Sequence, residues 1–85
     1  MAHFLVLALS HSDQIKQALE KHIPSSDRFD LTGSSAWLVS YPGTAADLNE
    51  KLGTKGGDNG NLLIAALTDI SGYGPNDMIR WIDKH

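Results

Sequence analysis

The fold is decided by the stretch His3-Phe4-Leu5-Val6-Leu7-Ala8-Leu9, a continuous apolar run that ends in Ser10-His11-Ser12-Asp13. Its short length and polar boundary favour a buried strand over a helix. Near the other end of the chain, Leu62-Leu63-Ile64-Ala65-Ala66-Leu67 has the same character. Side chains alternate along a strand, so both faces of these two strands are apolar. The sequence therefore predicts a sheet that needs cover on both sides.

Between the two runs, turn and cap signals divide the chain into further elements. Apolar residues at helical spacing follow Ser10 and Ser12, two possible N-caps, and stop before Pro24. The segments 28–32 and 36–41 read as an edge strand and a second strand joined as a hairpin. Thr44 can cap a helix that ends at Gly53, and a short helix is expected over residues 76–84.

The resulting order is β-α-β-β-α-β with a terminal helix, in one domain over residues 1–85. Crossover connections between strands of one sheet are right-handed, and this order then closes most simply as a ferredoxin-like sandwich of the α+β class. Both of its long helices cover one sheet face. The opposite face carries Leu5, Leu7 and Leu9.

An uncovered apolar face of several hundred Å² is at or above what soluble monomers usually expose. A second copy of the chain is the expected cover, because burying each leucine stabilises the assembly by roughly 1.5–3 kcal/mol. The terminal helix, with Trp81 and Ile82, is the competing cover. The sequence thus predicts a homodimer whose face includes Leu5, Leu7 and Leu9.

Composition narrows the function classes. The formal charge of −3 excludes a strongly basic domain held on nucleic acid by bulk electrostatics, although a local patch stays open. The chain has no cysteine, which removes disulfides and thiolate metal sites. No apolar run is long enough to span a bilayer, and none has the flanks of a secretory signal. We therefore expect a cytoplasmic protein.

Several stretches together resemble the CRISPR-associated protein 2 superfamily and the small SinR-like proteins allied to it. The matching parts are the opening strand, Ala36-Trp37-Leu38-Val39-Ser40, the helix Ala45–Leu52, the last strand with Gly72-Tyr73-Gly74, and Trp81-Ile82. The resemblance implies a ferredoxin-like homodimer that binds nucleic acid or, in some members, acts as a metal-dependent nuclease.

The family's nuclease activity depends on an aspartate at the end of the first strand. Here that region reads Leu7-Ala8-Leu9-Ser10, with no carboxylate before Asp13. Leucine and alanine cannot hold a hard cation, whereas two facing carboxylates could. No cofactor is expected, and Mg²⁺ or Mn²⁺ enters only if a displaced acid such as Asp13, Asp30 or Asp69 supports a nuclease.

The polar candidates are Ser10, His11, Asp13 and Asp69. Adjacent residues are not expected to converge as a catalytic triad does, so capping of the first helix by Ser10 or Ser12 is favoured. Asp69 follows the last strand and His3 begins the first, and an antiparallel pairing would bring them together as a surface contact. Both tryptophans are expected to pack in the core rather than stack on bases.

The interpretation that follows is a non-catalytic ferredoxin-like homodimer that acts by interaction with nucleic acid or protein. Two alternatives stay open: a metal-dependent endonuclease with a displaced acidic site, and an immunity-type or complex-assembly partner of another protein.

Overall fold

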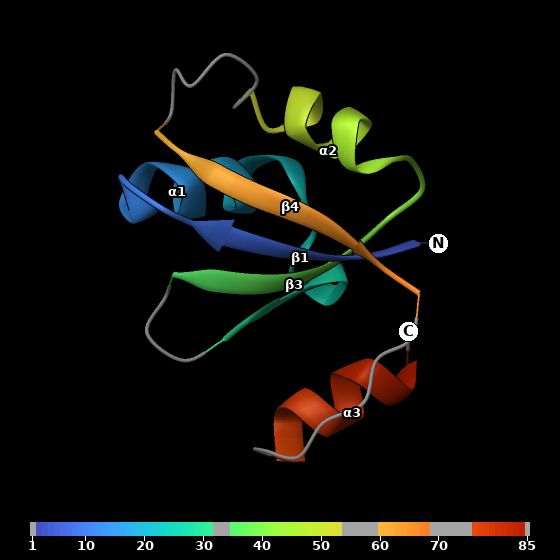
Figure 1. The fold of residues 1–85 in the computed structure, drawn as a ribbon. Coiled ribbons are helices and arrows are strands. Elements are labelled where there is room, and N and C mark those ends of the chain that lie inside the picture. Colours follow the sequence, from blue (N-terminus) through green and yellow to red (C-terminus); the bar gives the residue numbers. More distant parts are fainter. Residues whose placement is uncertain (1, 32–34, 54–59, 69–75, 85) are drawn as a thin grey trace.

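The computed structural model describes residues 2–31, 35–53, 60–68 and 76–84. Their elements are β1 (Ala2–Ala8), α1 (Ser12–His22), the 3-10 turn η1 (Ser25–Asp27), β2 (Arg28–Asp30), β3 (Ala36–Tyr41), α2 (Ala45–Lys51), β4 (Leu62–Leu67) and α3 (Asn76–Lys84). The strands form one antiparallel sheet in the order β2-β3-β1-β4 (Figure 1). The described part of the chain is thus a small α+β fold, as its sequence predicts.

The sequence-predicted elements are present, but the start of α1 differs. Neither Ser10 nor Ser12 is the N-cap. That position belongs to His11, which has a left-handed backbone with φ of 51° and makes no side-chain capping bond. The His11 carbonyl accepts from the N–H groups of Gln14 and Ile15 at 3.0 and 3.3 Å. The predicted caps were wrong because the Ser10 hydroxyl bonds instead to Asn61, which directly precedes β4, and because Ser12 is already the first residue of α1.

One sheet face packs on α1 and α2 and forms the core. Phe4 and Val6 of β1 are completely covered, as are Trp37 and Val39 of β3. The helices contribute the apolar positions that their spacing predicts, together with the residues that follow each helix: Ile15, Ala18, Leu19, Ile23, Leu48 and Leu52. Trp37 therefore has the core role expected for it.

The opposite face, called the far face below, is partly covered by α3. His3 and Trp81 meet edge to face with ring centroids 6.1 Å apart, and Trp81 Nε1–H donates to the Ser26 carbonyl at 3.2 Å. Leu38 and Ser40 of β3 lie on this same far face and point away from the core, and both are nevertheless buried. The competing cover named from the sequence, the terminal helix, is thus present over one part of the far face.

Candidate interaction surface

The rest of the far face is apolar and only partly covered in the described structure. Leu5 and Leu7 of β1 are half-buried. Leu63, which is paired with Leu7 in the sheet, is 53% exposed. Leu9 is 63% exposed and lies beyond the end of β1. The structure therefore groups Leu5 and Leu7 with Leu63, and it places Leu9 just outside the sheet.

The predicted dimer face of Leu5, Leu7 and Leu9 does not include Leu63, although its alternation with Leu62 places Leu63 opposite the core. Its exposure depends on the register, which pairs β4 with β1 and leaves β4 at the edge of the sheet. The apolar sequence of β4 is compatible with both a central strand and an edge strand, so it does not predict which of the two β4 is. Only the strand order makes Leu63 a surface residue.

The polar candidates at the end of β1 form a small cluster. Ser10 Oγ accepts from the backbone N–H of Asn61 at 2.8 Å. His11 Nδ1 lies 3.2 Å from the same oxygen. Because Ser10 Oγ already accepts one bond, its own hydrogen is available to the imidazole. The left-handed backbone of His11 thus brings its ring to Ser10, and among the described residues no acid joins the two as a catalytic triad would require.

Gly60 completes this cluster and explains its tight geometry. The glycine has a φ of 101°, and a Cβ placed on it would lie 2.7 Å from His11 Cβ and 2.8 Å from the Ser10 carbonyl. Only glycine fits at such a position. At the same place, the Leu9 and Ser10 N–H groups both donate to the Asn61 carbonyl, at 2.8 and 3.1 Å. The main role of the cluster is thus to hold the end of β1 against the start of β4.

The acidic candidates do not join this cluster. Asp13, in the first turn of α1, and Asp30, the last residue of β2, are both exposed. Asp69, and with it the expected contact to His3, lies outside the described residues. Within the described ranges, no three His, Asp or Glu side chains lie close enough together to hold a metal ion.

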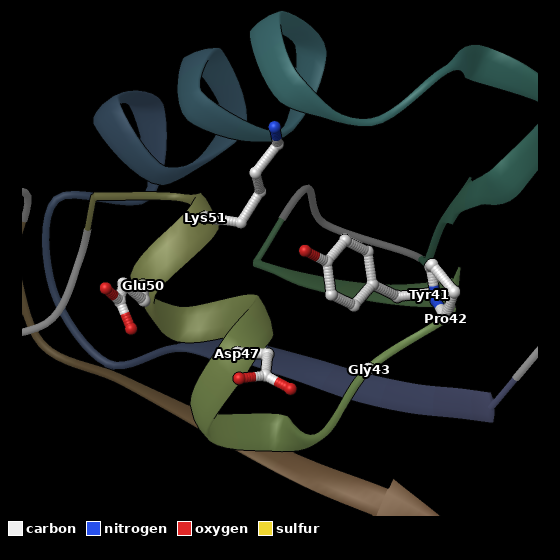
Figure 2. A pocket seen from close by; sticks show the side chains of 6 residues that line it. All are labelled: Tyr41, Pro42, Gly43, Asp47, Glu50 and Lys51. Atoms are coloured by element: carbon white, nitrogen blue, oxygen red, sulfur yellow. The ribbon is translucent and has the colours of Figure 1, made fainter.

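A separate open depression of about 410 Å³ lies beside the start of α2. Its charged side chains are Asp47, Glu50 and Lys51, with Tyr41 on the opposite wall. Figure 2 shows the two carboxylates and the ammonium group pointing in different directions, with no common centre. The arrangement provides a polar surface and does not bring an acid, a base and a nucleophile together.

Asp47 has a structural role in this depression. Its Oδ2 accepts from the Thr44 N–H at 3.0 Å, and its own N–H donates to Thr44 Oγ1 at 3.1 Å. This reciprocal capping box starts α2 and confirms Thr44 as the predicted cap. The bond from the Thr44 backbone, followed by its side chain, lowers the pKa of the Asp47 carboxyl below the ordinary 3.8. The carboxylate thus holds the helix start in place.

Comparison with known proteins adds no assignment. No protein-family model matches the chain, and no curated protein matches it either. None of the helices in the described ranges has the length and apolar character needed to cross a membrane.

Proposed function

We propose that this chain is a small non-catalytic interaction protein of the ferredoxin-like type, similar to CRISPR-associated protein 2, and that it works as a homodimer in the cytoplasm. The observation that carries the proposal is the apolar surface on the far face that α3 leaves uncovered, centred on Leu63. A second copy is the simplest cover for a surface that every copy exposes.

The strand order supports the ferredoxin-like part of the proposal. In the sequence order β1-α1-β2-β3-α2-β4, the two helices α1 and α2 contribute to the same core against one sheet face. Each helix joins strands that are separated by one antiparallel neighbour, β3 in the first case and β1 in the second. Two interleaved β-α-β units of this kind define a ferredoxin-like fold.

Charge favours a protein as the further partner over nucleic acid. The net charge is −3, and Arg28, one of the seven basic residues, is already used within the fold, where its Nε–H donates to the Ile23 carbonyl at 3.0 Å. Sequence-independent binding to nucleic acid requires several cations in line with the phosphates. We therefore propose a protein as the further partner, and the band-shift experiment below tests nucleic acid as the alternative.

Sedimentation equilibrium over a range of concentrations tests the dimer directly. We expect the mass to rise from 9.2 kDa towards twice that value as concentration increases. A mass that stays at the monomer value at all concentrations contradicts the proposal.

Incubation with short RNA and DNA tests the non-catalytic part. We expect no cleavage with Mg²⁺ or Mn²⁺ present, and no chelator-sensitive activity. Metal-dependent hydrolysis that is lost in Asp13→Asn or Asp30→Asn would establish the endonuclease alternative instead. A band shift that weakens with salt would identify nucleic acid as the further partner.

A further inference from the structure

The two edges of the sheet differ in how well they are protected. β2 is only three residues long and carries Arg28 and Asp30, and η1 directly precedes it. β4 is six residues long and contains no charged residue and no proline. Short edge strands with charges resist pairing with another chain, whereas long apolar ones do not. Among the residues that the structure describes, the β4 edge therefore lacks the usual protection.

The hydrogen bonds at the end of β1 indicate which backbone groups of β4 point outward. Ala8 N–H donates to the Ser35 carbonyl towards β3, and Leu9 N–H donates to the Asn61 carbonyl on the β4 side. Backbone groups alternate in this way along a strand. Leu5 and Leu7 therefore face β4, and in the antiparallel register their partners Ala65 and Leu63 face back.

The remaining residues of β4 must direct their N–H and C=O groups away from the sheet. These residues are Leu62, Ile64 and Ala66. Within the described residues, no backbone hydrogen bond reaches these outward groups. The edge is thus a row of alternating donors and acceptors flanked by apolar side chains, which is the form that another strand completes.

We propose that β4 pairs in antiparallel fashion with β4 of a second copy, so that the two sheets join into one continuous sheet. This inference rests on the self-association proposed above and specifies its contact, which places another apolar side chain beside Leu63 at the edge of the far face and leaves the cover of Leu5 and Leu7 unchanged. A two-fold axis perpendicular to the sheet keeps the core faces on one side and the far faces on the other. Residues of one face then meet residues of the same face.

The occupant is a second copy because β4 is complementary to itself. With the axis at Ala65, the exposed Leu63 lies opposite the partner's Leu67, and Ala65 lies opposite the partner's Ala65. Ile64 and the partner's Ala66 then exchange backbone hydrogen bonds. Every cross-strand pair within β4 is apolar, and no like charges meet.

The absence of cysteine from the chain allows a clean test by cross-linking. At the axis, Ala65 and its counterpart form a non-hydrogen-bonded pair with Cα atoms about 4.5 Å apart, which is within disulfide range. Ala65→Cys is therefore expected to give a disulfide-linked dimer on mild oxidation. Ala36→Cys is the matched control, because two copies of that far-face residue would lie five strand spacings apart, roughly 24 Å.

Amide hydrogen exchange on the unmodified chain gives an independent test. We expect the Ile64 and Ala66 amides to exchange at least about tenfold more slowly at high than at low protein concentration, because pairing protects them. The Ala65 amide bonds to β1 in both states and should be protected at both concentrations. Ala66→Pro removes an outward donor at an edge that tolerates proline, and it should abolish the dimer while the monomer stays folded.

The outcomes separate this inference from the proposed function. A monomer at all concentrations overturns both. A dimer that lacks concentration-dependent protection at Ile64 and Ala66, or that is linked through Ala36→Cys and not through Ala65→Cys, overturns edge pairing and leaves self-association standing.

Discussion

Both faces of this sheet are largely apolar in sequence, but they are covered very differently. On the core face, Phe4 and Val6 lie beneath α1 and α2 and have no significant exposure. On the far face, their neighbours Leu5 and Leu7 are half-buried, because α3 reaches only part of that surface (Figure 1). The hydrophobic pattern thus predicts which side chains need cover. The number and length of the helices packed on each face decide how completely those side chains are buried.

The largest expected effect comes from breaking the core face. Phe4→Ala leaves a cavity among fully packed side chains and should lower the free energy of unfolding by about 3–5 kcal/mol. Leu5→Ala, one residue along the same strand, should cost about half as much because its side chain is only partly covered. Urea denaturation of both variants measures the difference. Equal losses would show that the faces contribute equally.

Removing the anchor of α3 is expected to have the next largest effect. Trp81→Ala loses the contact with His3 and the bond to the Ser26 carbonyl, and should cost about 2 kcal/mol. The change should expose Leu38 and speed amide exchange in α3 while α1 and α2 keep their protection. Trp81→Phe, which keeps a ring without the N–H donor, should cost about 1 kcal/mol. Uniform loss of protection across all helices would contradict a separate cover.

Weakening the N-terminal cap of α2, one of the two helices that cover the core face, is expected to have a smaller effect on stability. Thr44→Ala removes the hydroxyl that accepts from Asp47 N–H and should lower the free energy of unfolding by about 1 kcal/mol. Thermal unfolding of this variant beside Ser26→Ala, whose hydroxyl lies outside both helix caps, measures the loss. Equal melting temperatures of Thr44→Ala and the unmodified chain would contradict a stabilising cap.

The same cap predicts a pH dependence. The folded-state pKa of Asp47 is lower than its ordinary 3.8, so the ionised carboxylate stabilises the folded chain above that pH. This contribution should be lost as the pH falls through the lowered pKa. Denaturation of the unmodified chain and of Asp47→Asn at several pH values measures it. The two stabilities should differ near neutral pH and converge in acid, and a constant difference would contradict the linkage.

The smallest effect on stability, and a large one on association, is expected at the uncovered part of the far face. Leu63→Lys replaces a 53% exposed side chain and should change the free energy of unfolding by no more than about 0.5 kcal/mol. The lysine should nevertheless prevent self-association, since a charge on an edge strand opposes pairing. Leu9→Lys is the matched control, as Leu9 is similarly exposed but lies outside the strand. Sedimentation of the two variants separates the edge from general surface hydrophobicity.

The sequence predicted the elements well because their local signals are strong. The strands 36–41 and 62–67 and the helix 76–84 lie where apolar runs and turn residues put them. The first strand is displaced by one residue, so Leu9, included in the predicted dimer face, falls outside it. The cap of α1 was missed, because the left-handed backbone of His11 is rare for a residue other than glycine, and because Gly60, which packs closely against His11, is far from it in the chain.

By itself the sequence determined the order of strands and helices, the two-sided apolar character of β1 and β4, and the capping box of α2. These are local properties, set by side-chain periodicity and by bonds between residues three positions apart. The tertiary structure alone decided that Trp81 lies against His3, that Ser10 bonds to Asn61, and that β4 is an edge strand with Leu63 exposed. Those features join residues that are far apart in the chain. They therefore depend on how the helices and strands pack together, which no local sequence pattern specifies.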